Sequence, residues 1–392
     1  MTRLLLSAVA IVVMFAGCSG NNAKTASPRQ KVLAAACRYL WGKQSPDGGW
    51  HSETYGILKS GQAWTPFVLF ALIDIPDSIV ERPVGGVDRG LSFIRSHVNA
   101  DGAIGLADPD VLEYPNYATA YALRVLIRSG RVEDPPLVAR MTQYLAGQQC
   151  TAVRGYTPDA LVFGGWGFGE TELPEGSPGY VDLSHTRRVL QALREAGHQD
   201  SAAFAASQVF LRLLQKDSAE TRLQPGVESK HDVRYDGGFY YSPVVLARNK
   251  GGRSVDSSGH DAYYRSYATA TCDGALALVA SGIPASDHRV ADALGWLKQH
   301  AALDHAEGIP VDSEEQWGRV MFFYHLLVRS EVYSGFNWQG EWKEEMIALL
   351  AARQNEDGSF SNPYGELNKE DDPILATAMA VMILTNVGKL TQ

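Results

Sequence analysis

Two kinds of helical pattern alternate along residues 31–392. In the first, apolar residues occupy one face; in the second, alanine and leucine extend nearly all round, which is typical of buried helices. A glycine turn, usually with an aromatic residue, follows each helix of the first kind, and no alternating β-branched strand pattern competes. The predicted helix pairs are 31–44 with 62–74, 87–98 with 117–129, 135–149 with 182–196, 200–215 with 266–281, 287–300 with 317–329, and 341–354 with 373–387.

This pair of helices recurs six times, with a period of about 50 to 70 residues. One pair cannot bury its apolar helix alone, so neighbouring pairs must stack. We therefore predict an all-α fold, an α/α toroid in which six apolar helices form an inner ring and six amphipathic helices an outer ring. A linear solenoid is the alternative, although no unit has the polar face of a terminal cap. The toroid is expected to form one domain, residues 31–392.

Two of the glycine turns share a longer motif. Gln44-x-x-Asp47-Gly-Gly-Trp50 and Gln354-x-x-Asp357-Gly-Ser-Phe360 have the same spacing of glutamine, aspartate, glycine and aromatic residue. Glycine lets the chain turn after the helix, aspartate accepts hydrogen bonds from backbone donors in the turn, and the ring covers the helix end. We expect these five residues to be structural.

The turns resemble the QW motif of the squalene–hopene cyclase and protein prenyltransferase superfamily, and the resemblance covers roughly residues 30–390. The stretches 182–186, 264–278 and 322–325 are similar to bacterial repeat proteins of that group. The resemblance implies a helical toroid whose central cavity holds an apolar ligand.

The sequence lacks part of the chemistry that this superfamily uses. The cyclases place their acid in an Asp-x-Asp-Asp run, and the matching run here begins with Asp182 but has Ser184 where the proton donor would stand. The prenyltransferases hold zinc with Asp, Cys and His, whereas Cys272 lies two residues before Gly274, about a helical turn too far along. No metal site, no cofactor and no squalene cyclisation are expected, and whether the protein is an enzyme stays open.

Candidate site residues lie mainly at the starts of the predicted inner helices. Asp182 and His185 are one helical turn apart, so the carboxylate can orient the imidazole as an acid/base pair. The same two residues also suit a helix N-cap, and this alternative stays open. We expect further aromatic and polar side chains to form the walls of a ligand cavity. They are Tyr117, Tyr264, Arg265, Tyr267, Trp317, Tyr324 and His325.

The N-terminal segment indicates export. Arg3 precedes an apolar stretch of 14 residues, shorter than the ~20 residues of a membrane span, so residues 1–17 are predicted to be a signal peptide. Residues 15–18 (Phe-Ala-Gly-Cys) resemble a bacterial lipobox, which implies palmitate-type lipidation of Cys18 and a flexible tether over 18–30. An ordinary signal peptide followed by a chance cysteine is the alternative. The expected location is the bacterial cell envelope, anchored to the membrane by lipid, with the serine after the cysteine favouring the outer membrane.

Charge excludes one class of partner. The chain has 35 Lys and Arg against 44 Asp and Glu, a net charge of −9, so binding to nucleic acid is not expected. The leading hypothesis is an envelope lipoprotein whose toroid binds an isoprenoid or other apolar lipid, with or without acid/base chemistry. Two alternatives stay open. One is a non-catalytic scaffold for another envelope protein, and the other is a polysaccharide lyase or hydrolase that uses Arg265, Asp261 and Asp273 in an open groove.

Overall fold

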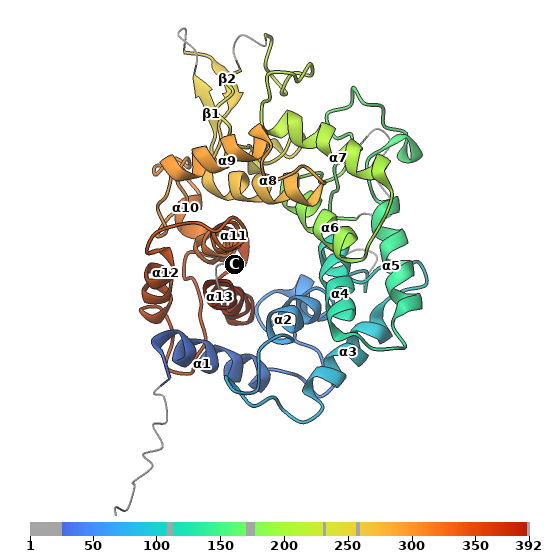
Figure 1. The fold of residues 1–392 in the computed structure, drawn as a ribbon, viewed down its shortest axis with the longest axis vertical. Coiled ribbons are helices and arrows are strands. Elements are labelled where there is room, and N and C mark those ends of the chain that lie inside the picture. Colours follow the sequence, from blue (N-terminus) through green and yellow to red (C-terminus); the bar gives the residue numbers. More distant parts are fainter. Residues whose placement is uncertain (1–25, 108–112, 170–176, 230–232, 256–258, 390–392) are drawn as a thin grey trace, which may run out of the picture.

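The computed structural model describes residues 26–107, 113–169, 177–229, 233–255 and 259–389. In these residues the chain forms a ring of helices in two concentric layers (Figure 1). The inner layer consists of α2 (Trp64–Leu72), α4 (Pro115–Ser129), α6 (Leu183–Glu195), α8 (Ala268–Ala280), α11 (Phe322–Gly335) and α13 (Pro373–Val387). The outer layer consists of α1 (Pro28–Gly42), α3 (Gly86–His97), α5 (Pro135–Gly147), α7 (Ser201–Leu214), α9 (His288–Gln299) and α12 (Trp342–Ala351).

The ring is closed. Each inner helix packs against the next in the order α2, α4, α6, α8, α11 and α13, and α13 packs in turn against α2. The first outer helix, α1, contacts both α12 and α13, so the first repeat meets the last. These contacts confirm the predicted α/α toroid and exclude the linear solenoid.

The two layers differ in burial as their sequences predict. In α13, 12 of 15 residues are buried, whereas in the outer helix α3 only 5 of 12 are. Inner helices α6 and α13 begin at aspartate N-caps, Asp182 and Asp372, whose side chains accept backbone N–H groups of the first turn. A capping box between Ser27 and Gln30 starts α1, so this first helix begins at Pro28 rather than at the predicted residue 31.

A glutamine ties four of the turns to the repeat that follows. Its amide donates one hydrogen bond to the carbonyl of the turn glycine and another to a carbonyl near the start of the next outer helix. The acceptors are Gly48 and Gly86 for Gln44, Gly164 and Ala203 for Gln149, Gly237 and Arg289 for Gln215, and Gly358 and Val32 for Gln354, at 2.7–3.0 Å. The bond from Gln354 to Val32 of α1 helps to close the ring.

The other residues of the predicted turn motif make local contacts. Asp47 accepts the N–H of Gly49 at 3.0 Å, and Asp357 accepts the N–H of Ser359 at 2.9 Å. Trp50 donates its indole N–H to the carbonyl of Leu40 at the end of α1, at 2.7 Å. The rings of Trp50 and Phe360 are fully buried. The aspartate bonds therefore shape the turn itself, and the Trp50 bond holds the first turn against the helix that precedes it.

A threonine at the start of an inner helix holds five of the turns. Its Oγ1 accepts the backbone N–H of the residue at the centre of the turn, which is buried and needs a partner. The pairs are Thr65 with Trp50, Thr119 with Ile104, Thr186 with Trp166, Thr271 with Phe239 and Thr377 with Phe360, at 2.9–3.1 Å. In the fifth repeat His325 has the position of this threonine, and its Nε2 bonds instead to a carbonyl oxygen, that of Ala302, at 3.0 Å.

Two features differ from the predicted elements. The insert between α7 and α8 contains an antiparallel hairpin, β1 (Arg253–Val255) with β2 (Asp261–Tyr264), where no strand was expected. These strands of three and four residues are too short for alternation to be visible in the sequence. The predicted helix 317–329 is divided at Met321 into α10 (Trp317–Val320) and the longer α11.

None of the helices in the described ranges combines the length and the apolar composition needed to span a lipid bilayer. The segment 1–25, including Cys18, lies outside the described residues, so the signal peptide and the lipidation site stay predictions.

Candidate functional site

A cavity of about 410 Å³ lies at the end of the toroid where the inner helices begin. The first turns of α2, α4, α6, α11 and α13 contribute to it, together with loops that precede α8 and α13. Nine aromatic rings dominate its described lining, with three cationic side chains and no carboxylate. The rings belong to Trp64, Phe67, Tyr114, Tyr117, Phe168, Tyr180, Tyr241, Trp317 and Tyr324.

Asp182 and His185 form a hydrogen-bonded pair at this cavity. The Asp182 carboxylate is fully buried at the start of α6, where its Oδ1 accepts the N–H of His185 at 2.9 Å and the hydroxyl of Ser184 at 3.1 Å. Its Oδ2 lies 2.8 Å from Nδ1 of His185. The aspartate is therefore the N-cap of α6 and also the hydrogen-bond partner that orients the imidazole.

The other nitrogen of His185 faces the aromatic lining. The centroid of the His185 ring lies 4.8 Å from that of Phe168, 5.5 Å from that of Tyr117 and 6.2 Å from that of Tyr114. His185 is only 5% exposed, and its buried Nε2 has no hydrogen-bond partner among the described residues. Because the carboxylate only accepts, neutral His185 carries its proton on Nδ1, which leaves the Nε2 lone pair available to a ligand.

The surroundings of Asp182 keep it ionised. Burial acts to raise its pKa, but the charge of His185 and the hydrogen bonds from His185 and Tyr241 outweigh burial and hold the pKa below its usual value. Burial and the nearby aspartate raise the pKa of Tyr241 well above its usual value, so this phenol stays protonated. An ionised Asp182 cannot protonate an alkene as a cyclase acid does, but it suits the orientation and stabilisation of an imidazole base.

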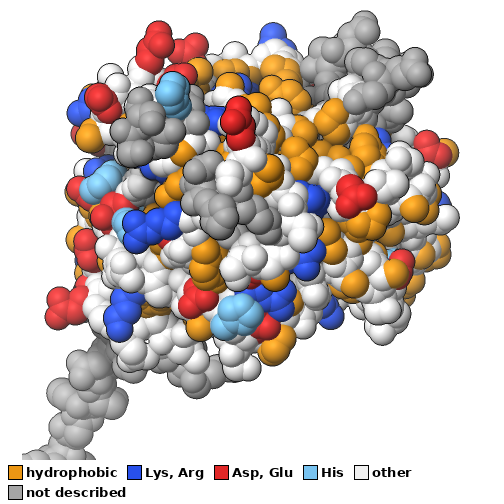
Figure 2. Space-filling model, turned by 90° about the horizontal axis from the view of Figure 1, so that it is seen from above, with side chains coloured by type: hydrophobic (Ala, Val, Ile, Leu, Met, Phe, Trp, Pro, Cys, Tyr) orange, Lys and Arg blue, Asp and Glu red, His pale blue; other side chains and the backbone are white. Residues whose placement is uncertain are grey.

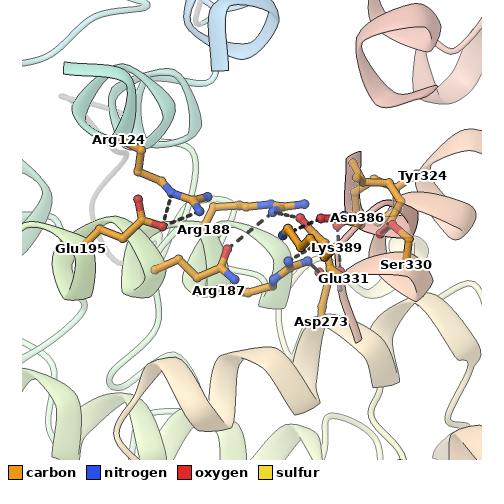
Figure 3. Close-up of polar contacts among 12 residues, drawn as sticks. Arg124, Arg187, Arg188, Glu195, Asp273, Tyr324, Ser330, Glu331, Asn386 and Lys389 are labelled. Atoms are coloured by element: carbon orange, nitrogen blue, oxygen red, sulfur yellow. Dashed lines mark hydrogen bonds and ion pairs between the residues drawn. The ribbon is translucent and has the colours of Figure 1, made fainter. Parts of the chain in front are cut away.

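A buried ionic network lies deeper along the same helices (Figure 3). Tyr324, on the cavity wall, donates its hydroxyl to Oδ2 of Asp273 at 2.7 Å, and Arg187 donates to Oδ1 of Asp273 at 2.6 Å. Glu331 accepts from Arg187 and, at 2.9 Å, from Arg188. The arginine side chains are 0% and 1% exposed. Charged side chains of α6, α8 and α11 thus pair with one another between the inner helices, and Tyr324 connects this network to the cavity wall.

The structure separates the predicted cavity walls into two groups. Tyr117, Trp317 and Tyr324 line the cavity, as does His185. Four others do not line it, and each has a different environment. Tyr264 stacks on Tyr240 at 5.8 Å, Arg265 donates to the carbonyl of Gly251 at 2.8 Å, Tyr267 is buried at the start of α8, and His325 replaces the turn threonine of the fifth repeat.

The cavity also contains side chains that the sequence did not suggest. Tyr114 precedes α4, Phe168 lies in a glycine turn, and Tyr241, Lys250 and Lys369 lie in the loops before α8 and α13. Phe168, between two glycines, was visible as a turn aromatic, but the loop residues have no periodicity that would reveal their direction.

The residue sets considered for other chemistries do not assemble. Asp273 is paired with the buried Arg187, and Arg265 donates to the carbonyl of Gly251, so these two groups do not meet; the side chain of Asp261, the third member of that set, lies outside the described residues. Burial raises the pKa of the Cys272 thiol to about 12, which disfavours the thiolate that binds zinc. Within the described ranges no three His, Cys, Asp or Glu side chains gather as a metal site.

Comparison with known sequences gives no family-model match and no match among curated proteins. Comparison of structures does give matches over nearly the whole chain. A variant of the type II terpene cyclase MstE from Scytonema, in complex with its substrate geranylgeranyl dihydroxybenzoate, has 14% identity and a TM-score of 0.54, with 93% of this chain and 98% of that chain covered.

Two further structural matches also cover nearly the whole of both chains. A protein from Actinoplanes has 13% identity and a TM-score of 0.53, covering 92% of this chain and 100% of that chain. An inactive variant of the α-1,6-mannanase GH76A of Salegentibacter, in complex with α-1,6-mannotriose, has 11% identity and a TM-score of 0.51, covering 91% and 98%. The fold is thus the terpenoid-cyclase-like α/α toroid that the turn motifs predict, and a mannanase shares it. At these identities the similarity shows the fold alone.

Proposed function

We propose that the protein binds an isoprenoid or another apolar lipid in the aromatic-lined cavity, and that Asp182 and His185 act on it as an acid/base pair. The observation that carries this proposal is the buried Nε2 of His185, which has no partner among the described residues and lies among aromatic rings that line the cavity. A polar atom left without a partner in such a place is costly unless a ligand pairs with it.

The size and the lining of the cavity support a small apolar ligand. Its volume of about 410 Å³ lies within the ~300–1,000 Å³ typical of small-molecule sites. Nine rings offer apolar area and π faces. That a terpene cyclase of the same fold binds a geranylgeranyl compound is consistent with this proposal, although only the fold is shared.

The chemistry proposed for His185 is proton transfer rather than alkene protonation. With Asp182 ionised, Nε2 accepts a proton from a hydroxyl or an activated carbon of the ligand, and the carboxylate stabilises the resulting imidazolium. Hydrolysis of a glycosidic bond is not proposed, because it needs two carboxylates at the scissile bond and the described cavity lining has none.

A protein-binding scaffold receives no specific support. The most exposed large apolar side chains are Val84, Val132, Val153 and Val311, which are far apart in sequence and lie in different connections between helices. On the side shown in Figure 2, charged side chains of both signs are interspersed with apolar ones. A docking surface would require a contiguous apolar patch.

The proposed location is the cell envelope, with Cys18 lipidated. This proposal rests on the sequence of the N-terminal segment. Labelling of the expressed protein with radioactive palmitate is expected to occur in the unaltered chain and to be absent in Cys18→Ser. Equal labelling of both proteins, or labelling of neither, would contradict the proposed lipidation.

Variants of the pair test the site. The purified protein is incubated with a lipid extract of its source organism, and consumed and formed lipids are followed by mass spectrometry. We expect Asp182→Asn to lower turnover by about 100-fold or more, His185→Ala by a similar factor, and the exposed His288→Ala to leave it unchanged. Turnover that persists in both site variants would show that the chemistry lies elsewhere.

A further inference from the structure

The cavity has a charge that contrasts with the rest of the chain. The protein as a whole has a net charge of −9, yet the described cavity lining contains Arg248, Lys250 and Lys369 and no Asp or Glu. A purely apolar ligand would desolvate these cations without offering them a partner, which is costly. The lining therefore suggests that the ligand has a polar part as well as an apolar one.

None of the three cations has a carboxylate partner within the described part of the chain. Among the described residues the Nζ of Lys250 makes one long hydrogen bond of 3.3 Å, to the carbonyl of Arg248, and it lies 4.5 Å from the ring centroid of Tyr241 and 4.9 Å from that of Trp317. The guanidinium of Arg248 lies 5.6 Å from the same Trp317 ring. Two like charges thus share one aromatic ring, and an anion between them would relieve their repulsion.

Lys369 lines the cavity from the connection that precedes α13. Its Nζ donates to the hydroxyl of Tyr114 at 2.9 Å. Both residues have a left-handed backbone, with φ of 61° for Lys369 and 51° for Tyr114. Such conformations are unfavourable for side-chain-bearing residues and persist where the surroundings impose them, often at binding sites. The surroundings of the two residues thus hold a cation and a phenol at the cavity in spite of this backbone cost.

We infer that the ligand is an amphipathic anion, whose single carboxylate or phosphate-ester head binds Arg248, Lys250 and Lys369 while its apolar chain fills the aromatic part of the cavity. This inference rests on the proposed function, because it specifies the ligand of the same cavity. Arg248 offers a planar fork of donors and the two lysines offer point charges, a combination that suits either head.

The ionisation of Lys250 is consistent with an anion site. Burial lowers the pKa of Lys250, the charge of Asp182 acts to raise it, and the nearby Arg248 and Asp273 act in opposite directions, with a net pKa of about 8. The phenol of Tyr241, which also faces this lysine, stays neutral. Lys250 is thus charged at neutral pH although its burial disfavours the charge, and a bound anion would offset this desolvation cost.

Three probes with one chain and different heads test the inference. Farnesol, farnesoic acid and farnesyl monophosphate are titrated into the full-length purified protein, and binding is followed by the fluorescence of the tryptophans at the cavity. We expect at least one of the two anions to bind about 10-fold or more tightly than the alcohol at low salt, and the difference to shrink as NaCl is added. The stronger of the two anions identifies the head.

Variants then locate the head. Lys250→Met is expected to weaken binding of the preferred anion about 10-fold and to leave farnesol binding unchanged, with Lys369→Met acting in the same direction. Lys298→Met, on the exposed side of α9, is the matched control and should change neither. Unchanged farnesol binding also shows that each variant is folded.

The outcomes separate this inference from the proposed function. If the alcohol binds as tightly as both anions, or if Lys250→Met weakens all probes equally, the anionic head is wrong while an apolar-ligand cavity stands. If neither the alcohol nor the anions bind to the unaltered protein, both proposals are wrong. The salt dependence of the unaltered protein decides the matter even if a variant does not fold.

Discussion

Replacing Glu331 with glutamine tests whether the ionic network holds the toroid together. Glu331 on α11 accepts from two arginines of α6, and Arg187 has a second partner in Asp273 of α8. Arg188 has no other carboxylate partner in the described structure. The substitution keeps the shape of the side chain and removes its charge, so it leaves Arg188 buried without a counterion.

The expected loss of stability is about 3 kcal/mol or more. Breaking one partner of a buried ion pair costs about 3–5 kcal/mol, because the remaining charge is uncompensated. The lowered pKa of Glu331 gives a second value for this loss of stability. Burial acts to raise it, but the charges of Arg187 and Arg188 and their hydrogen bonds hold it at about 2, against an ordinary 4.5. That difference corresponds to about 3 kcal/mol. The side chain is 18% exposed, so solvent screening reduces this value only in part.

Urea unfolding at two pH values measures the effect. A carboxyl group whose pKa is lowered by folding contributes stability above its unfolded pKa, and this contribution is lost as the pH falls through 4.5 towards 2. At neutral pH, Glu331→Gln should unfold at lower urea than the unaltered protein. Near pH 3 the two should approach each other. The exposed Glu344→Gln on the outer helix α12 is the control and should behave as the unaltered protein.

Two results would refute this reasoning. The first is a difference between Glu331→Gln and the unaltered protein below about 1 kcal/mol at neutral pH, which is the size of an ordinary surface effect. The second is an unchanged acid dependence in the variant, which would show that other carboxylates dominate the loss of stability at low pH.

Three further predictions concern the turns and the cavity. Gly164→Ala is expected to destabilise the protein by about 3 kcal/mol or more in urea unfolding, because the added Cβ would lie 1.8 Å from the carbonyl oxygen of Ala206 in α7. In the control Gly197→Ala the added Cβ has no atom within 4 Å, so only the positive φ of 70° costs stability, about 1 kcal/mol. Thr186→Val removes the acceptor of the buried Trp166 N–H and should cost about 1–3 kcal/mol, measured in the same way; no loss would mean that water replaces the hydroxyl. Binding of the preferred farnesyl anion should weaken as the pH rises through 8, because Lys250 then loses its proton, and Lys250→Met should abolish this dependence in the fluorescence titration.

Most of the fold follows from the pattern of residues. The inner helix 373–387 has the predicted bounds, and most other helix ends differ by only a few residues, because caps and glycine turns mark them locally. Ring closure was predictable because no repeat has the composition of a terminal cap. The turn glutamines Gln149 and Gln215 were less visible, since their glycines lie 15 and 22 residues further along instead of four.

The site was predictable only where it lies on helices. Asp182 and His185 are three residues apart on α6, so their contact is local and the spacing reveals it. Lys250 and Lys369 reach the cavity from loops, where no periodicity gives the direction of a side chain. His325 and its neighbour Tyr324 were both assigned to the cavity, but only Tyr324 lines it, whereas His325 has the position of the turn threonine of other repeats and bonds to the carbonyl of Ala302.

The central claim is that the toroid contains a ligand cavity, and native mass spectrometry tests it most directly. The purified protein is incubated with the lipid extract of its source organism and transferred to the gas phase under conditions that preserve complexes. The proposal predicts one stoichiometric adduct whose mass matches an amphipathic isoprenoid or acyl lipid and which is displaced by the preferred farnesyl anion. A mass of the protein alone at high lipid excess would contradict it and would favour the scaffold instead.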